Sequence, residues 1–417
     1  MRLRSPIFLV IALLLGCLAA QGQVGHAPVE KVDTIPIAKI PDIAPKSPEE
    51  FQRAFRKAVD FLLANQNEDG SWGTHTKTKG LNVICPPPTG PLSFRSASTA
   101  LCLLGLYGSP LRDEPAVKES CRRGEDYLLE ALPRLKRGET MTILNAWAHG
   151  YGLEALCKGA ERLPKDSKRY DELEQCAALQ IKRLDELTDA RGGWGYYTFE
   201  VFSVRPIGMP TSFMTAAVLV AMKDTERVFG IKPDQRQLRR TVKFLVSQRT
   251  PSGNYVYSSD HTYHPTLPIN RHMGSLARTP AGDLALLWYD PDVVTMRQLE
   301  DGLDRLWSRS GWLDLAAKKP IPHESFAQVA GYFVFYGYYY AGRCLSVLPK
   351  DKAKRHAAHL ASQMMLFQEK DGSWWDYPLY NYHKFYGTGY ALSALDEAWD
   401  VLYGDSVAPG NSNGAEK

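Results

Sequence analysis

The sequence predicts an all-α fold in which six outer and six inner helices close into an (α/α)6 toroid. Three observations lead to this fold class. A pattern of Gln, Gly and an aromatic residue returns along the chain at intervals of about sixty residues, a length that holds one helical hairpin with its loop. In each repeat an amphipathic helix precedes a more uniformly apolar one, as expected for an outer and an inner layer. Six such hairpins fill the region 47–405, which is predicted to be a single domain.

Two copies of the pattern have identical spacing: Gln66, Gly70, Trp72 and Gln368, Gly372, Trp374. Weaker copies end at Trp194, Tyr255 and Trp312. The glycine permits the left-handed turn that ends an outer helix, and the glutamine amide can bond exposed backbone groups at neighbouring helix ends. The indole can pack across the hairpin. These residues are therefore predicted to be scaffold and not catalytic.

The twelve helices are placed by the alternation of the two helix types. Outer helices, with charges on one face, are predicted near 48–66, 115–136, 167–187, 234–248, 293–309 and 351–368. Inner helices, rich in Ala, Gly, Thr, Leu and Tyr, are predicted near 94–108, 142–158, 211–224, 277–288, 323–347 and 385–403. Small side chains allow the inner helices to pack tightly inside a ring.

The ends of the chain differ from the repeats. Residues 1–22 have the basic start, apolar run and small residues of an export signal. An alternative end of this signal is Cys17, because Leu-Leu-Gly-Cys resembles a bacterial lipobox, whose cysteine would carry a lipid anchor. We therefore expect a periplasmic or extracellular protein, with a lipid-anchored form as the alternative. Residues 23–46 are predicted to be a flexible linker and 406–417 a disordered tail.

Composition narrows the function. The chain has 50 basic and 46 acidic residues spread along its length, which argues against a nucleic-acid partner. Six cysteines follow Cys17 without CxxC spacing, so no zinc knuckle or other metal site is predicted. They either form disulfides, as an exported protein allows, or are small buried apolar side chains. No cofactor is predicted.

The Gln-x3-Gly-x-Trp turns resemble the QW repeat of the squalene–hopene and oxidosqualene cyclases. The architecture also resembles that of protein prenyltransferase β subunits, and the resemblance covers nearly the whole folded region. It implies a terpenoid cyclase-like toroid with a lumen for an isoprenoid. The Asp-x-Asp-Asp motif that protonates the alkene in hopene cyclases is missing, and Gly387 stands where prenyltransferases have a zinc-binding histidine. Neither proton-initiated cyclisation nor zinc-dependent prenylation is therefore predicted.

The loops that lead from outer to inner helices gather at one end of the toroid, which is the predicted mouth of the site. The loop 258–278 is long and polar, which is more typical of function than of scaffold. Candidate catalytic residues at this mouth are His261, Tyr263, His264, His272, His323 and His383. Candidate ligand-binding residues are Arg95, Asn270, Arg271 and Arg278, since arginines and helix N-termini attract an anion. The alternative for each arginine is an ion pair with a nearby carboxylate.

The inner helices add three further candidates. Asp283 lies in an apolar inner helix, where it is either a catalytic acid or base near the lumen, with a raised pKa, or the ion-pair partner of an arginine. Tyr336 and Tyr386 are candidate ligand-binding residues, because aromatic faces can stabilise a carbocation or stack on a sugar. Core packing is their alternative. His149 is predicted to be a core histidine.

Three functions remain open at this stage. The chain binds, cyclises or isomerises an isoprenoid or another apolar ligand in its lumen, or it is a lyase-like enzyme that acts on an acidic saccharide through His, Tyr and Arg. The third alternative is a non-catalytic interaction module. A lumen ligand would favour the first, an open groove on the rim the second, and a plugged lumen the third. Membrane contact is expected only through a lipid at Cys17.

Overall fold

The computed structural model describes residues 40–78, 87–135, 145–200 and 203–404. These residues belong to one compact unit, Ile37–Lys417. The predicted export signal, with Cys17, and the predicted tail lie outside the described residues. No helix in the described part of the chain is long and apolar enough to cross a membrane.

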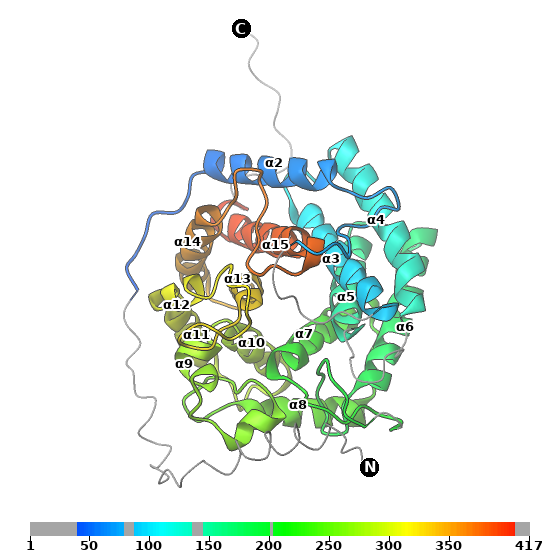
Figure 1. The fold of residues 1–417 in the computed structure, drawn as a ribbon. Helices are drawn as coiled ribbons and strands as arrows, with labels where there is room; N and C mark the ends of the chain where they lie inside the picture. Colours follow the sequence, from blue (N-terminus) through cyan, green and yellow to red (C-terminus); the bar gives the residue numbers. More distant parts are fainter. Residues whose placement is uncertain (1–39, 79–86, 136–144, 201–202, 405–417) are drawn as a thin grey trace, which may run out of the picture. The chain divides into compact units, whose positions relative to one another are not determined.

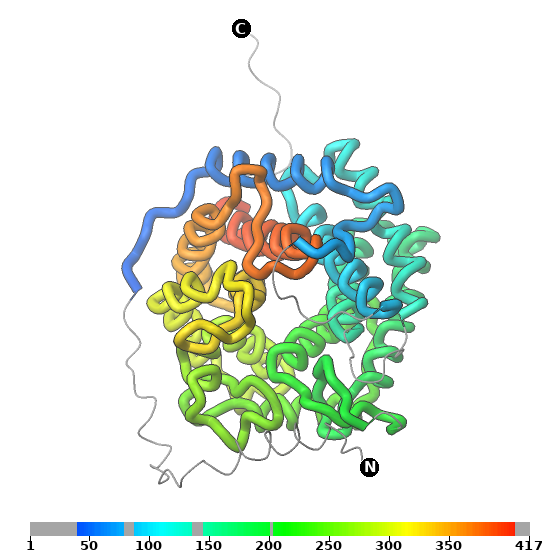
Figure 2. The backbone as a smooth tube through the Cα atoms, in the orientation of Figure 1, coloured from blue at the N-terminus to red at the C-terminus, as the bar shows by residue number. Residues whose placement is uncertain are grey.

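Six helices form a closed inner ring (Figure 1). In chain order they are α3 (Thr89–Gly108), α5 (Asn145–Ala160), α7 (Ser212–Phe229), α10 (Thr279–Tyr289), α13 (Val334–Leu345) and α15 (His383–Tyr403). Each packs on the next, and α15 packs on α3. Figure 2 shows this closure, with the last helix, in red, beside the early part of the chain. Their residues are buried nearly all round, which explains their uniformly apolar composition.

Six amphipathic helices surround this ring. They are α2 (Pro48–Ala64), α4 (Pro115–Arg134), α6 (Lys168–Leu187), α8 (Gln235–Gln248), α11 (Met296–Ser308) and α14 (Lys350–Leu366). The loops carry the short helices α9 (His272–Ser275) and α12 (Gly311–Asp314) and the 3-10 turns η2 (Ser259–Tyr263), η3 (Pro268–Asn270), η4 (Gly331–Phe333) and η5 (Tyr380–Tyr382). The predicted (α/α)6 toroid is confirmed.

The Gln–Gly–Trp turns hold the hairpins together. The indole nitrogen of Trp374 donates to the backbone oxygen of Met364 at 2.7 Å, and its backbone N–H donates to Thr388 Oγ1 of the following inner helix at 3.1 Å. Trp72 and Trp194 repeat both bonds. The amide of Gln368 donates to the backbone oxygen of Ala54 in α2 at 2.9 Å, which ties the last hairpin to the first. These contacts agree with a scaffold role.

Gly372 offers a test of how tightly the last turn approaches α2. Its φ is +90°, and a Cβ there would lie 2.2 Å from the backbone oxygen of Lys57, whereas Gly230, with φ +71°, has nothing within 4 Å. An alanine at either position must hold a left-handed backbone, which costs about 1–2 kcal/mol. Because Gly372→Ala must also displace α2, we expect its free energy of unfolding in urea to fall at least about 1 kcal/mol further than that of Gly230→Ala. Equal losses would contradict this close approach.

The structure differs from the predicted elements at two places. The fifth inner helix begins at Val334 and not near 323, because the preceding segment forms a loop at the mouth. The segment 40–46 packs on the toroid, where the sequence suggested a flexible linker: Ile40 is buried, and Tyr403 donates from its hydroxyl to the backbone oxygen of Lys46.

The structure also tests the predictions for His149 and for the cysteines. His149 is a core histidine whose Nδ1 bonds Gln180 Oε1 at 2.6 Å, and burial lowers its pKa to about 4. The cysteines that the structure describes are free and buried, which favours their interpretation as apolar side chains: Cys102, Cys121, Cys157, Cys176 and Cys344.

Candidate functional site

Three tyrosines, two histidines and an arginine gather above the N-termini of the inner helices, at the predicted mouth. We call this group the mouth site, and its members are Tyr196, Tyr257, His261, Arg278, His323 and Tyr332. The Tyr196 and Tyr257 hydroxyls are hydrogen bonded to each other. The Tyr257 and Tyr332 hydroxyl oxygens are 3.5 Å apart, and the Tyr332 hydroxyl lies 3.2 Å from His323 Nε2. The hydroxyls of the three tyrosines therefore form a hydrogen-bonded chain that ends at the His323 imidazole. We call it the tyrosine chain.

The protonation of His323 follows from its second ring nitrogen. Nδ1 lies 2.7 Å from the backbone oxygen of Gln328, which can only accept a hydrogen bond, so Nδ1 carries the proton. Nε2 then holds the lone pair and accepts the bond from the Tyr332 hydroxyl. His323 and Gln328 both have left-handed backbones, with φ +64° and +56°. Such conformations cost about 1–3 kcal/mol each in non-glycine residues and concentrate at functional sites.

His261 approaches the same tyrosine from the loop after α8. Its ring centroid is 5.2 Å from that of Tyr257, and the His323 centroid is 5.3 Å from it. His261 Nδ1 bonds Ser258 Oγ at 2.8 Å. Burial lowers the pKa of both histidines below 6.5, and the nearby Arg278 lowers it further. Two imidazoles that stay neutral at neutral pH therefore flank one phenol.

Arg278 supplies a buried positive charge beneath the mouth site. Its guanidinium lies over the ring of Tyr257, 5.5 Å from the centroid, and donates to the backbone oxygens of Gly274, Tyr255 and Ile269. Within the described residues it forms no ion pair with a carboxylate. The side chain is 1% exposed, and burial lowers its pKa to about 10. Arg278 was a candidate for direct ligand binding, but this geometry gives it an electrostatic role from below.

Aromatic side chains of the inner helices meet beneath the mouth in the described part of the chain. Tyr336 of α13 donates to the backbone oxygen of Phe213 of α7 at 2.7 Å, although α10 separates the two helices in the ring. The hydroxyl of Tyr390 in α15 donates to that of Tyr151 in α5. Tyr336 is 2% exposed, so it is a core residue here and not a ligand platform. Aromatic side chains of these inner helices therefore make contacts that bridge one intervening helix of the ring.

Asp283 does not face the lumen. Its carboxylate accepts a hydrogen bond from the Tyr255 hydroxyl at 2.9 Å and lies 3.4 Å from Arg249 Nε, between α10 and the outer helices. A Cβ at Gly302 of α11 would lie 3.1 Å from Asp283 Oδ2. Burial raises its pKa to about 6, as the sequence suggested. Of the two alternatives for Asp283, the structure shows the ion-pair partner of an arginine, behind the ring, and not the catalytic acid or base at the lumen.

The candidate residues of the loop 258–278 lie in different environments. Tyr263 and His264 are exposed and, within the described structure, make no side-chain contact with the tyrosines of the mouth site, and His272 is buried in α9. Asn270 organises the loop: its Oδ1 accepts from the Tyr257 backbone N–H at 2.9 Å, and its amide donates to the backbone oxygen of His264 at 2.8 Å. The structure therefore gives this loop a supporting role around His261.

The remaining candidates lie elsewhere. Arg95 pairs with Asp69 at 3.4 Å, and Arg271 donates to the backbone oxygen of Thr266. The Tyr386 hydroxyl donates to Asp376 Oδ1 at 2.6 Å, and that buried carboxylate also accepts from the backbone N–H of Phe335. Arg95, Arg271 and Tyr386 thus have partners within the protein and are not assembled with the mouth site.

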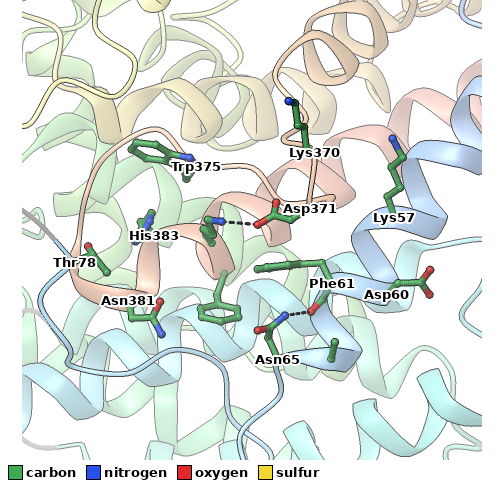
Figure 3. A pocket seen from close by; sticks show the side chains of 13 residues that line it. Lys57, Asp60, Phe61, Asn65, Thr78, Lys370, Asp371, Trp375, Asn381 and His383 are labelled. Carbon is green, nitrogen blue, oxygen red and sulfur yellow. Dashed lines mark hydrogen bonds and ion pairs between the residues drawn. The ribbon is translucent and has the colours of Figure 1, made fainter.

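A groove of about 960 Å³ lies on the rim beside α2 (Figure 3). His383 and Trp375 stand on one side of it, in edge-to-face contact at 5.3 Å, and Lys57 and Lys370 stand on the other. Two residues after Trp375 along the chain, Tyr377 packs edge-on against Tyr332 at 5.4 Å. One short segment therefore separates this groove, which we call the rim groove, from the mouth site.

Sequence reasoning missed Tyr196, Tyr257 and Tyr332. The first two stand two residues after the turn aromatics Trp194 and Tyr255, on extended segments joined by isolated β-bridges. On an extended segment, residues two apart share a face. A search for aromatics at this offset could have found Tyr196 and Tyr257. For Tyr332 the sequence showed only an aromatic-rich stretch.

No protein-family model matches the chain, and no curated protein matches it. Among solved structures it resembles cellobiose 2-epimerase from Spirochaeta thermophila, with a TM-score of 0.53 and 13% identity over 85% of this chain and 98% of the epimerase. It also resembles an α-1,6-mannanase from Salegentibacter, with a TM-score of 0.52 and 9% identity over 84% of this chain and 99% of the mannanase. A type II terpene cyclase from Scytonema aligns with a TM-score of 0.48 and 16% identity, over 86% of this chain and all of the cyclase.

At these identities the likeness shows the fold, which is the α/α toroid predicted from the sequence. Fold alone does not define function, so chemistry must be argued from the site. The fold and the site together define an α/α-toroid protein whose mouth carries two histidines and three hydrogen-bonded tyrosines.

Proposed function

We propose that this toroid is an enzyme that moves a proton on and off a carbon atom of a saccharide, with His323 and His261 as its acid–base pair. The observation that carries the proposal is the Tyr332–His323 hydrogen bond, whose direction is set by the Gln328 backbone oxygen. A base for proton abstraction must be neutral and within hydrogen-bond reach of its proton donor or relay. His323 meets both conditions.

The arrangement suggests how the proton moves. As the substrate C–H bond breaks, its proton passes to the Tyr332 hydroxyl oxygen while the phenol proton passes to His323 Nε2. The electron pair left on carbon becomes an enolate on the adjacent carbonyl or carboxylate of the sugar. The positive field of Arg278 and the hydroxyls of Tyr196 and Tyr257 stabilise that oxygen. The proton taken up by His323 passes back along the Tyr332 and Tyr257 hydroxyls to the neutral His261 beside Tyr257. The His261 imidazolium then returns it, either to carbon in an epimerisation or to the leaving oxygen in an elimination.

A saccharide fits better than an isoprenoid for two reasons. The described lumen is spanned by aromatic contacts such as Tyr336 with Phe213, so an apolar chain would have to displace core side chains. The rim groove instead combines aromatic faces with amide, hydroxyl and charged groups, as at Trp375, Asn381 and Thr78, which suits sugar rings and their hydroxyls. Two of the toroids with a similar fold are named for saccharide substrates, which is compatible with this choice.

Carbon-bound proton exchange tests the proposal directly. The protein is incubated in D₂O with neutral oligosaccharides, such as cellobiose and mannotetraose, and with oligogalacturonate, and NMR follows loss of the sugar C–H signals. We expect deuterium at the carbon next to the carbonyl or carboxylate. Exchange with a neutral sugar indicates an epimerase, and exchange with the uronate, together with unsaturated product, indicates a lyase. A folded protein that exchanges none of these sugars, or that retains an isoprenoid in native mass spectrometry, argues against it.

A further inference from the structure

A second cavity lies at the opposite end of the toroid from the mouth site. Its volume is about 100 Å³, and it is lined mainly by the second halves of α5, α7, α13 and α15. We call it the basal cavity. The C-terminal ends of the inner helices lie at this end, and each carries a partial negative charge from its unpaired backbone oxygens. A cation is therefore favoured here before any side chain is considered.

The side chains add to this negative potential. Five carboxylates line the cavity: Glu154, Glu161, Asp224, Asp396 and Glu397. Three cations line it: Lys158, Arg227 and Arg343. Since the cavity has two more carboxylates than cations, one cation must pair with more than one carboxylate. Arg343 bonds both Glu154 and Asp224 at 2.8 Å and lies 3.8 Å from Glu397, and Lys158 reaches Asp396 only at 3.7 Å.

Glu154 shows that the cavity has unused bonding capacity. Its Oε2 accepts from both the Tyr339 hydroxyl and Arg343, but its Oε1 is buried and has no hydrogen-bond partner within the described structure. The side chain is 1% exposed. Leaving a buried acceptor without a donor costs about 1–3 kcal/mol, more for a charged group. A ligand that brings an N–H donor to Oε1 would recover that free energy.

We propose that the basal cavity binds a small primary ammonium ion, which donates to Glu154 Oε1 and lies among carboxylates that outnumber the cations of the lining by two. The volume of about 100 Å³ is room for about three waters, at roughly 30 Å³ each, and so for a methylammonium or ethanolamine ion. A metal ion is a poorer occupant. Among the residues that the structure describes, no three His, Cys, Asp or Glu side chains are arranged to hold one.

The protonation of the cavity gives this binding a characteristic pH dependence. Burial raises the pKa of Glu154 to about 7. The groups that face Glu154 are Asp224 on α7, Tyr339 and Arg343 on α13, and, across the cavity, Asp396 and Glu397 on α15. A bound ammonium ion favours the ionised carboxylate and so displaces its proton. Burial also raises the pKa of Asp396 to about 8. Affinity should therefore rise with pH through about 7 to 8, and each binding event should release protons.

Isothermal titration calorimetry of the full chain with methylammonium chloride tests the site. We expect saturable binding at pH 8 that weakens at pH 6, with an apparent enthalpy that varies with the buffer's ionisation enthalpy. Glu154→Gln should weaken binding at least about tenfold, the fold-change for a lost charge-assisted bond of about 1.4 kcal/mol or more. Tetramethylammonium has the same charge but no N–H donor and should not compete.

Glu125→Gln is the matched control. Glu125 also accepts a bond from a tyrosine hydroxyl, that of Tyr107 at 2.6 Å, but it belongs to outer helix α4 and does not line the cavity. It should bind methylammonium as the unmodified protein does. If Glu154→Gln does not fold, as judged by thermal unfolding, Asp396→Asn takes its place and should also weaken binding. No saturable binding, equal binding by the two glutamine variants, or equal binding of tetramethylammonium would overturn the proposal. None of these results depends on the chemistry at the mouth.

Discussion

Replacing His323 with glutamine lowers kcat for carbon-proton exchange by about 10²–10⁴-fold, the contribution of a positioned general base. Glutamine can still donate an amide N–H to the Gln328 backbone oxygen, so the loop keeps its anchor, but the basic Nε2 lone pair is lost. Tyr332→Phe removes the hydroxyl that relays the proton and should lower kcat comparably. The measurement is the rate of deuterium incorporation under saturating sugar, with circular dichroism to verify the fold.

His264→Gln is the control for this prediction. His264 lies in the loop 258–278, which also carries His261, is exposed, and has no part in the tyrosine chain. The exchange rate of His264→Gln should therefore stay within about twofold of that of the unmodified protein, as for a surface change. If His264→Gln lost as much kcat as His323→Gln, the conformation of the mouth loops, and not the imidazole of His323, would control the rate.

The pH dependence of kcat/KM provides an independent check. Both His261 and His323 have pKa values lowered below 6.5, first by burial and then by Arg278. A base is active when unprotonated, so activity should persist at pH 6.5 and fall only as the pH drops through the lowered values. Removing the guanidinium in Arg278→Met should move this acidic limb to higher pH. An acidic limb above pH 6.5 in the unmodified protein would contradict the assignment of these histidines.

The fold could be predicted because each of its rules is local. The spacing of Gln66, Gly70 and Trp72 encodes a turn whose bonds all form within one hairpin or with the next, so a single copy is readable without knowing the rest. The two helix types can be told apart because a helix buried on one side is amphipathic, whereas a helix buried all round is uniformly apolar. His261 and His323 were found for the same reason, because loops that follow outer helices must lie at one end.

The arrangement within the site depends on contacts that no local pattern encodes. Tyr332 meets Tyr257 across 75 residues, and Glu154 meets Arg343 across 189. For Asp283 the sequence left two positions open, near the lumen or in an ion pair with an arginine, because an acid in an apolar helix can face either the axis of the toroid or its outer layer. The side chain of Arg249, which selects the second, lies at the end of the outer helix of the same hairpin, beyond the long loop that connects it to α10. Local sequence could not decide between them.

Replacing Arg343 with methionine lowers the free energy of unfolding by about 3–5 kcal/mol, the cost of removing one partner from a buried ion pair. Arg343 is the only cation among the described residues that bonds Glu154, and it also bonds Asp224 and approaches Glu397. Methionine has a similar length but cannot donate, so Glu154 loses its only cation among the described residues, while Asp224 keeps only Arg227 at 3.4 Å. Urea denaturation at pH 8 measures the loss.

The loss of unfolding free energy in Arg343→Met should become smaller as the pH falls, because Glu154 has a raised pKa in the folded state. Its folded pKa is raised to about 7 from 4.5, so the folded state already holds more protons than the unfolded state between these values, and its stability decreases as pH rises through this window. Without the positive charge of Arg343, the folded pKa rises further and the decrease becomes steeper. Arg343→Met should therefore be closest to the unmodified protein at pH 5 and furthest from it at pH 8.

Arg122→Met is the control that tests whether the large loss of stability in Arg343→Met comes from the burial of its ion pairs. Arg122 also bonds two carboxylates, Glu119 at 2.6 Å and Asp126 at 2.7 Å, but all three side chains are about half exposed on outer helix α4. Exposed pairs of this kind contribute about 0–1 kcal/mol because water and salt screen them. If both methionine variants lost the same free energy at pH 8, the charges at the base of the toroid would be as well solvated as those on its surface. The negative potential that the ammonium site requires would then be absent.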